Sequence, residues 1–316
     1  MKMRNQMNPI NYSIIIPHYN IPVYLNRLLH TIPQRQDVQI IVVDDCSNQY
    51  IDILRTIKCR YPKVEWYSTG INGGAGKARN IGLEHAVGKY IIFADADDFF
   101  TVAFDDILEE YKDTCYDTIY FSACSLNVDT LENADRAEYF HRILGGYFKS
   151  KNIEDIRYAF VVPWSKIILR EMIEKHNIRF ATTNVSNDIM FSTLCDSHTN
   201  NITADARAIY CITTRENSLS KQFKPQDMLS RLKTEIWRFK FFQRLEVNRH
   251  PSERYFVWHI ENIEATGDKN LLKEAENLLE SNGISVKTVR KFVRKQKLRR
   301  IPHLILSALN LQHIKR

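Results

Sequence analysis

Short apolar runs alternate with amphipathic helical patterns through the first third of the chain. Such alternation predicts βαβ units and a mainly parallel sheet. The runs are apolar at consecutive positions, which indicates strands buried under helices on both faces of the sheet. The fold class we expect is therefore α/β and Rossmann-like. The predicted strands cover residues 12–16, 38–44, 64–68 and 90–95, and the predicted helices between them cover 22–32, 50–60 and 75–87.

The pattern becomes mixed from about residue 117 and almost entirely helical after Lys221. We expect strands in DTIYFSAC and ARAIYCIT, with helices near 152–160, 166–176 and 187–197. Further helices are expected near 225–247, 252–265, 270–281 and 285–312. This organisation predicts an α/β domain over 1–221, with halves at about 11–115 and 116–221, and a helical C-terminal region over 222–316 that ends in a tail at 285–316.

The positive charge of the chain is concentrated in this tail. The net charge is +7, yet residues 281–316 contain ten Lys or Arg and no acidic residue, so the first 280 residues carry 34 basic against 37 acidic side chains. Apolar side chains in the tail recur at i, i+3, i+4, i+7 and i+8, which predicts a basic amphipathic helix attached to an anionic membrane surface. The alternatives are packing on the protein or self-association into a homo-oligomer. Because no aromatic platform interleaves with the charge, we expect no nucleic-acid binding. The apolar positions are Ile301, Leu304, Ile305, Ala308 and Leu309.

The cysteines and the apolar segments indicate a protein of the cytoplasm. Six cysteines are scattered along 316 residues with no CxxC pair and no zinc-ligand spacing, which fits a reducing compartment. The N-terminus has no signal-peptide core, and no run approaches the roughly 18 to 20 apolar residues that a spanning helix needs. We therefore expect a cytoplasmic protein that is peripheral on the cytoplasmic face of the inner membrane.

Polar residues follow each of the four strands predicted in the first third of the chain. In open α/β sheets the ligand crevice lies beyond the carboxyl ends of the strands, so these residues are expected to meet there. Crowded carboxylates repel one another, and their partial burial is costly unless a cation or a set of donors compensates. The four groups are Pro17 to Asn20, Asp44 to Ser47, Asn72 to Gly74, and Asp95 to Asp98.

The sequence DADD (95–98) directly follows the fourth apolar strand. Asp95 and Asp97 can both reach one divalent ion and the phosphate that the ion bridges. Ligation by oxygen alone suits Mg²⁺ or Mn²⁺. The structural alternative is that Asp97 or Asp98 caps a helix over 101–112.

The segment INGGAGKARNIG (71–82) is a glycine turn that leads into a helix. It is not a Walker A motif, because Ile71 stands where that motif has its first glycine and Ala78 stands where it has Ser or Thr. Lys77 and Arg79 in the first helical turns suit the binding of a diphosphate. A purely structural turn and helix start is the alternative.

Three further features have both a functional and a structural interpretation. Asp44 and Asp45 follow a strand, and they either bind a nucleobase or ribose or form a turn and a helix cap. Trp164 is either a core aromatic or a platform beside a sugar. Asp188 opens a predicted helix, where the residues alone favour a cap over a catalytic carboxylate.

Four blocks together resemble a known family. SIIIPHYN, IVVDDCS, GGAGKARNIG and IIFADADD, in this order and at these spacings, look like the nucleotide-sugar-binding half of a glycosyltransferase family 2 enzyme with the GT-A fold. Segments at 161–180, 184–191 and 214–220 resemble the acceptor-side blocks of that family. The resemblance covers roughly residues 11–221.

The resemblance implies roles for the residues at the strand ends. Tyr19 would stack on uracil, and Asp45 would accept a hydrogen bond from the uracil N–H. Asp95 would meet the ribose or the water shell of a Mn²⁺ or Mg²⁺ ion, and Asp97 would bind that metal directly. Asn72 and Arg79 would lie near the nucleotide and its diphosphate. The full predicted set for the nucleotide sugar is Pro17, Tyr19, Asp45, Asn72, Arg79, Asp95, Ala96 and Trp164.

The resemblance also implies a catalytic base and a reaction. Asn187-Asp188 stands where the family usually has Glu-Asp, so Asp188 would be the general base that deprotonates the acceptor hydroxyl. The implied activity is inverting, metal-dependent transfer of a sugar from a nucleotide donor, a UDP-sugar, to a hydroxyl of a glycan or lipid-linked oligosaccharide in surface polysaccharide synthesis. The alternatives are a phosphatase of the haloacid-dehalogenase type, which also has DxD after a strand, and a non-catalytic assembly subunit with the same fold.

Overall fold

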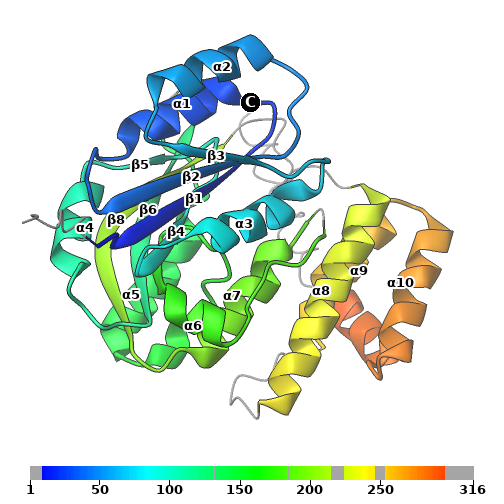
Figure 1. Cartoon of the computed structure of the whole chain (residues 1–316). Helices are drawn as coiled ribbons and strands as arrows, with labels where there is room; N and C mark the ends of the chain where they lie inside the picture. The colour runs from blue at the N-terminus through cyan, green and yellow to red at the C-terminus, as the bar shows by residue number, and fades with distance from the viewer. Residues whose placement is uncertain (1–8, 131, 184, 215–223, 246–252, 296–316) are drawn as a thin grey trace, which may run out of the picture. The chain divides into compact units, whose positions relative to one another are not determined.

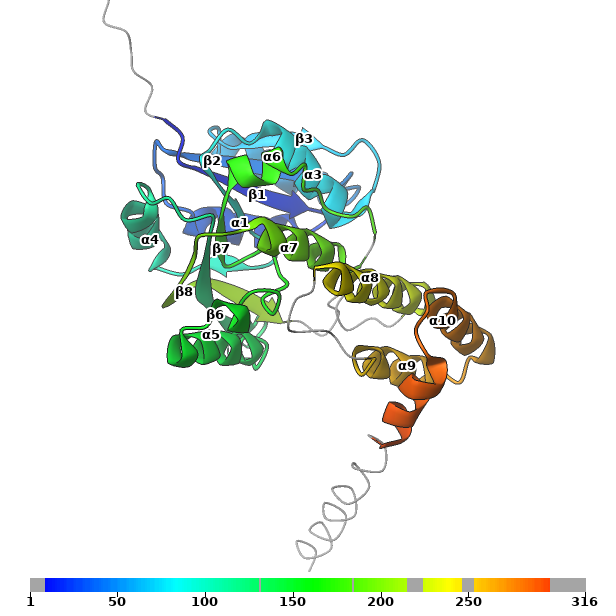
Figure 2. The same cartoon turned by 90° about the horizontal axis from the view of Figure 1, so that it is seen from below.

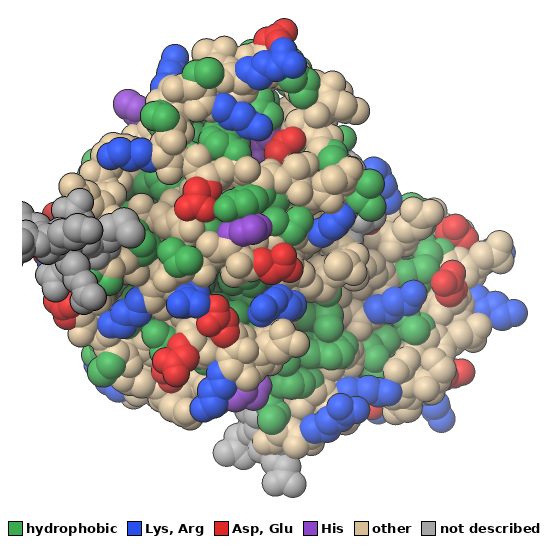
Figure 3. All heavy atoms as spheres, viewed as in Figure 1, with side chains coloured by type: hydrophobic (Ala, Val, Ile, Leu, Met, Phe, Trp, Pro, Cys, Tyr) green, Lys and Arg blue, Asp and Glu red, His purple; other side chains and the backbone are tan. Residues whose placement is uncertain are grey.

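The computed structural model describes residues 9–130, 132–183, 185–214, 224–245 and 253–295. The chain divides into two compact units, Met1–Lys221 and Gln222–Arg316, and each is described by itself. On the face shown in Figure 3, Lys and Arg side chains are interspersed with Asp and Glu among the described residues. No helix among the residues described is long and apolar enough to cross a membrane.

The first unit is built on one eight-stranded sheet with the order β3-β2-β1-β4-β7-β6-β8-β5 (Figure 1). The first four strands of this order are parallel to one another. β7 runs antiparallel to both of its neighbours, β6 and β8 are parallel, and β5 is antiparallel to β8. The strands are β1 (Tyr12–His18), β2 (Val38–Asp44), β3 (Glu65–Ser68), β4 (Tyr90–Phe93), β5 (Phe99–Phe100), β6 (Thr118–Asn127), β7 (Lys166–Leu169) and β8 (Ile202–Thr214).

Helices cover both faces of this sheet, because successive side chains of a strand point to opposite faces. Ile14 and Ile16 of β1 belong to one apolar core, and Ile15 between them belongs to the other. The core that contains Ile14 packs against α1 (Pro22–Thr31), α2 (Ile51–Arg60), α4 (Phe104–Tyr111) and α5 (Glu138–Ser150). The core that contains Ile15 packs against α3 (Gly74–His85), α6 (Arg170–Lys175) and α7 (Asn187–His198). Figure 2 shows these last three helices side by side, and the predicted α/β class is confirmed.

Every strand and helix predicted in the first third of the chain is present, and the differences lie further on. The helix expected over 166–176 is β7 followed by α6, because the short apolar run KIIL fits a buried strand as well as a helix. The helix expected over 152–160 is only the short 3₁₀ helix η1 (Ile153–Asp155). Helix α5 was not predicted.

The second unit is helical throughout its described residues. It contains α8 (Pro225–Arg244), α9 (Tyr255–Ala265), α10 (Lys269–Ser281) and a helix over residues 286–295. Val289 and Val293 are buried in the apolar core of this unit. The beginning of the predicted tail therefore packs on the protein, while residues 296–316 lie outside the described part of the chain.

Candidate active site

The loops that follow β1 and β2 are tied together by hydrogen bonds. Asn20 donates its backbone N–H to the hydroxyl of Ser47 over 2.8 Å, and its side-chain oxygen accepts from the backbone of Asn48 and Gln49. These bonds hold the loop that carries Tyr19 at the rim of the sheet, and Tyr19 is 43% exposed there. The predicted uracil-stacking position is thus an accessible ring on a fixed loop.

His18 also belongs to this rim, although the sequence pattern around it predicted no role in the site. The residue is buried at the end of β1, and its Nδ1 lies 2.8 Å from a carboxylate oxygen of Asp44. Asp44 also accepts from the backbone N–H of Ser47. The Asp44 carboxylate is therefore part of the structure of the rim, and these bonds hold the pKa of Asp44 below its usual range against the effect of burial.

Asp45 fastens the glycine turn to the sheet. One of its carboxylate oxygens accepts from the hydroxyl of Thr69 and from the backbone N–H of Gly73, both over 2.8 Å. The other accepts from the backbone N–H of Gly74 over 2.7 Å. Gly74 has φ of +81°, a conformation that L side chains rarely adopt. The carboxylate thereby sets the start of α3, which places Arg79 in the site.

Arg79 joins two parts of the site that lie far apart in the sequence. Its guanidinium donates to the Asp95 carboxylate over 2.6 Å and to the side-chain oxygen of Asn187 over 3.0 Å. The side chain is only 7% exposed and lies 5.2 Å from the ring centre of Phe180. Gly76 permits the close approach, because a Cβ there would meet the carbonyl oxygen of Ala181 at 2.4 Å. Arg79 thus fixes the DADD loop relative to the start of α7.

The DADD loop is held from behind by β8. The backbone N–H of Asp95 donates to the hydroxyl of Tyr210 over 2.8 Å. The carbonyl of Asp97 accepts from the Thr213 hydroxyl over 2.6 Å and from Arg27. The sequence did not predict the supporting roles of Tyr210 and Thr213. They lie in an apolar strand, and its local pattern does not show that the strand contacts a loop more than one hundred residues earlier.

Asp98 is a buried support of this loop. Its carboxylate accepts from the backbone N–H of Thr213 over 2.7 Å. Burial, together with the negative charges of Asp97 and Asp95, raises the pKa of Asp98 well above its usual range. The alternative that Asp97 or Asp98 caps the next helix is wrong, because α4 begins at Phe104 without a side-chain cap.

Asp188 lies in the first turn of α7, one residue from the Asn187 side chain that Arg79 contacts. The helix cap is Ser186, so the alternative of Asp188 as the cap residue is wrong. Asp188 is partly exposed. Burial raises the pKa of Asp188, the charge of Arg79 opposes that effect, and the charge of Asp95 adds to it. The two predicted halves of the site therefore meet through Arg79.

The remaining predicted residues lie in different environments. Asn72 is exposed next to the glycine turn, whereas Pro17 and Ala96 are buried and shape the edge of the sheet. Trp164 is 3% exposed and stacks on Tyr210 with ring centres 5.5 Å apart. The prediction of Trp164 as a sugar-binding platform is wrong, since its side chain fills the core. Residues 215–220 of the late polar block lie outside the described residues.

The carboxylates of Asp95 and Asp97 fit a divalent ion that is bound by protein oxygens on one side and by diphosphate oxygens on the other. The side chain of Asp95 is 31% exposed and Asp97 is partly exposed, so both residues can be reached from solvent. No cluster of three or more His, Cys, Asp or Glu is arranged around a metal position among the described residues. A site with only two carboxylates is ordinary for Mg²⁺, which is usually bound by one or two carboxylates together with phosphate oxygens and water.

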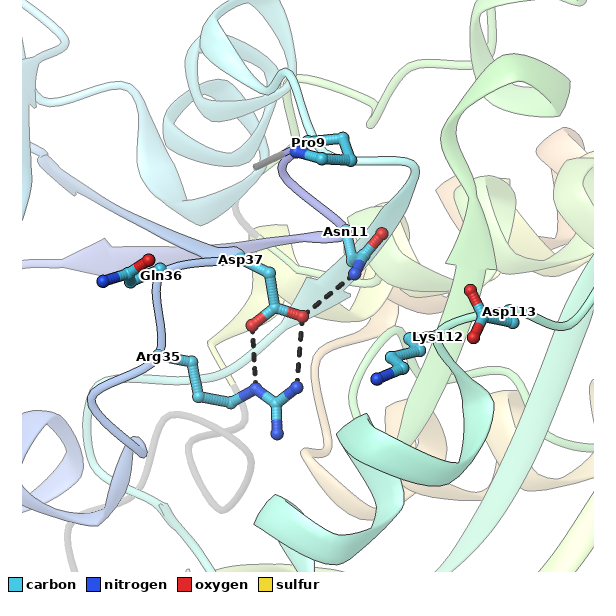
Figure 4. Close-up of a pocket in the computed structure, with 7 residues that line it drawn as sticks. All are labelled: Pro9, Asn11, Arg35, Gln36, Asp37, Lys112 and Asp113. Carbon is cyan, nitrogen blue, oxygen red and sulfur yellow. Dashed lines mark hydrogen bonds and ion pairs between the residues drawn. The ribbon is translucent and has the colours of Figure 1, made fainter. Parts of the chain in front are cut away.

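A cavity of about 330 Å³ lies at the other end of the sheet (Figure 4). Its lining includes Asn11 before β1 and Asp37 before β2, at the amino ends of parallel strands, whereas DADD follows the carboxyl end of β4. Arg35 and Asn11 both donate to Asp37 there. Because the cavity lies at the amino ends of these strands, it is not part of the candidate site at their carboxyl ends.

Comparison with known proteins identifies the family of this chain. The family model described as glycosyl transferase family 2 matches residues 13–176. An uncharacterized glycosyltransferase of Haemophilus influenzae is 43% identical over 96 residues, which are 29% of this chain and 38% of that protein. The poly(ribitol-phosphate) beta-N-acetylglucosaminyltransferase TarS of Staphylococcus aureus is 33% identical over 96 residues, 28% of this chain and 17% of that protein. The chain thus matches well under half the length of these relatives.

Solved structures show the same fold at low sequence identity. The crystal structure of S. aureus TarS 1–349 in complex with UDP-GlcNAc has a TM-score of 0.56 and 22% identity, covering 86% of this chain and 73% of that one. A mannosyltransferase from Pyrobaculum calidifontis in complex with GDP-Man and Mn²⁺ has a TM-score of 0.52 and 15% identity, covering 98% of this chain and 88% of that one. With a family model that matches more than half of its residues, the chain belongs to glycosyl transferase family 2.

Proposed function

We propose that this protein transfers a sugar from a nucleotide sugar to an acceptor hydroxyl, with inversion at the anomeric centre and with the help of a divalent metal. One observation carries the proposal. Arg79 binds Asp95 of the DADD loop and Asn187 beside Asp188 at the same time. One predicted donor-binding carboxylate and the neighbour of the predicted base thus share one buried guanidinium, which supports a single site for both.

The donor in this proposal is a UDP-sugar. TarS has been crystallised with UDP-GlcNAc and with UDP, and the P. calidifontis enzyme with GDP-Man, which supports a nucleotide-sugar donor. Tyr19 offers an exposed ring for the uracil, and Asn72 is exposed next to the turn. Because both oxygens of Asp45 already bind the glycine turn, a uracil N–H would use a remaining lone pair of that carboxylate. Pro17 and Ala96 contribute the shape of the edge.

The metal in this proposal is Mn²⁺ or Mg²⁺, held by Asp97 with Asp95 beside it. When bound, it would offset the negative charge of the departing diphosphate. The oxygen-only donor set and the partial exposure of the two aspartates support this assignment. Asp98 is turned to Thr213 and remains a support for the loop.

Asp188 is the base of the proposed reaction. It accepts the proton of the acceptor hydroxyl, and the oxygen then attacks the anomeric carbon from the face opposite the diphosphate. A single displacement of this kind inverts that carbon. The raised pKa of Asp188 makes it a stronger base than an ordinary aspartate, which suits general-base catalysis near neutral pH.

The acceptor in this proposal is a surface glycan or a lipid-linked oligosaccharide. Similar proteins include TarS and the minor teichoic acid biosynthesis protein GgaB of Bacillus subtilis, whose names point to cell-surface polymers. The basic, apolar stretch of residues 296–316 would hold the protein at an anionic membrane where such an acceptor is made. Such attachment would make the protein peripheral on the cytoplasmic face of the membrane.

The activity is tested by incubating the purified protein with a panel of nucleotide sugars and Mn²⁺ and following release of the nucleoside diphosphate. We expect release from a UDP-sugar, at least slowly without acceptor. Asp97→Ala and Asp188→Asn should abolish transfer, while Asp52→Asn, whose side chain is 93% exposed on α2, should not change it. Release of phosphate from small phosphoesters would support the phosphatase alternative instead. No turnover of any donor with intact nucleotide binding would support the non-catalytic alternative.

Membrane attachment is tested by deleting residues 296–316 rather than the whole predicted tail. The deletion should begin there because Val289 and Val293 are needed for the core of the second unit. We expect the full chain to sediment with vesicles that contain anionic lipid and the shortened chain to stay in solution. Equal sedimentation of both proteins would contradict the membrane assignment.

A further inference from the structure

Two cysteines that lie 87 positions apart in the sequence are direct neighbours in the sheet. Cys124 of β6 and Cys211 of β8 are paired residues of two parallel strands. Adjacent strands lie about 4.8 Å apart, and disulfides bridge Cα atoms about 4.4–6.8 Å apart. The backbone spacing at this pair is therefore within the range that a disulfide needs.

Irregular register creates this pairing. At the start of the two strands Thr118 pairs with Ile202, and continuing that register would place Cys124 opposite Ala208. The register shifts on either side of Ser122 insert extra residues into β8, after which Cys124 pairs with Cys211. Bulges of this kind often re-aim side chains. Here they place the two cysteines opposite each other on neighbouring strands.

The two thiols differ in exposure and interact with each other. Cys124 is partly exposed, whereas Cys211 is fully buried. The interaction between the two thiols lowers the pKa of Cys124 and raises the pKa of Cys211, and the Cys124 thiol donates to the backbone carbonyl of Tyr210 over 3.7 Å. A partly exposed sulfur of this kind is open to an oxidant, and a second thiol stands beside it to resolve the product.

The cysteine pair adjoins the strand that supports the DADD loop. Cys211 pairs with Phe99, immediately after that loop, across β5 and β8. Two residues further along β8, Thr213 binds both the carbonyl of Asp97 and the carboxylate of Asp98. A new covalent bond at Cys211 would pull on the strand segment that positions both groups.

We propose that Cys124 and Cys211 form an oxidant-sensitive pair whose disulfide displaces the DADD loop and switches the site off. The Cys124 thiolate attacks hydrogen peroxide, so an S–O bond forms, the O–O bond breaks, and hydroxide leaves and is protonated to water. The Cys211 sulfur then attacks the resulting sulfenic acid, forming the S–S bond while the S–O bond breaks. The hydroxide released takes the Cys211 proton, so two thiols and one peroxide give one disulfide and two waters.

The covalent step is tested by mass spectrometry on the full chain, independently of any transfer activity. The protein is treated with hydrogen peroxide, free thiols are alkylated, and the digest is searched for linked peptides containing Cys124 and Cys211. We expect that link in the wild type and in Cys59→Ser, whose parent cysteine is exposed elsewhere, and not in Cys124→Ser or Cys211→Ala. Absence of the link in the wild type overturns the proposal, whatever other oxidation is found.

The structural consequence is tested by hydrogen exchange. Exchange of the backbone amides over 95–100 should rise on oxidation and return to its first value after dithiothreitol, and Cys124→Ser should show no change. If the crosslinked protein shows unchanged hydrogen exchange over 95–100, the proposed effect of the disulfide on the DADD loop is wrong.

The effect on catalysis rests on the function proposed above. Misplacing a catalytic group by about 1 Å costs on the order of 100-fold in rate, so nucleotide release should fall by about that factor and recover with dithiothreitol. Full nucleotide release from the crosslinked wild type would also overturn the switch. If no nucleotide sugar is turned over by the reduced protein, the proposed function fails, while the crosslink and the exchange results still decide the switch.

Discussion

Replacing Asp45 by Asn should reveal whether this carboxylate holds the glycine turn together. The two side chains have the same shape, but Asn has an NH₂ group in place of one oxygen. The remaining oxygen can keep the bonds from Thr69 and Gly73. The NH₂ group would then face the backbone N–H of Gly74, which now donates over 2.7 Å. Two donors would oppose each other in a residue that is 4% exposed.

The magnitude follows from these bonds. A hydrogen bond to a charged group is worth about 1.5–3 kcal/mol, and a buried donor without a partner costs about 1–3 kcal/mol. With partial relaxation of the turn, we expect a loss of about 3 kcal/mol in the free energy of unfolding of the first unit. For a domain of this size such a loss lowers Tm by roughly 6–12 °C.

Calorimetry of the wild type, Asp45→Asn and the control Asp52→Asn measures the effect. Asp52 forms an exposed ion pair with Arg55, so its substitution should cost less than about 1 kcal/mol. A fall in Tm of less than about 2 °C for Asp45→Asn, which corresponds to under about 1 kcal/mol, would refute the structural role. If such a stable variant also had a raised KM for the donor, nucleotide binding would be the main role of Asp45.

Three further predictions follow from the site and its surroundings. Because the pKa of Asp188 is raised and the base must be deprotonated, kcat/KM should rise with pH through a pKa above the ordinary aspartate value of about 3.9, and a profile flat down to that value would contradict the assignment. Trp164→Ala should cost about 3–5 kcal/mol of stability, measured by calorimetry, with little change in donor KM, whereas Trp258→Ala at an exposed position should cost far less. Gly76→Ala should lower nucleotide release, because the new Cβ would meet the Ala181 carbonyl and the Asn187 side chain at the start of α7. Gly146→Ala, with open space around it, should leave release unchanged.

The local sequence predicted the elements in the first third of the chain well because its signals are short-range. Strand and helix periods, glycine in the turn and polar residues at strand ends are all read within a dozen residues. The same kind of signal failed at KIIL, which is too short to separate a strand from a helix. Helix α5 was missed although its buried residues Phe140 and Leu144 have the i, i+4 spacing of a helix face. Near the site, the local sequence predicted the DADD loop and the segment of Asp188. It did not predict that Arg79 joins them.

Periodicity and residue type are enough to predict the α/β class, the order of the elements in the first third of the chain and the carboxylates at the strand ends. Three features arise only in the folded sheet: Arg79 bridges Asp95 and Asn187, Trp164 fills the core, and Cys124 pairs with Cys211. Each of these depends on which strand lies beside which and in what register. That choice is made by the packing of the whole sheet, and a shift of one residue would change every pair.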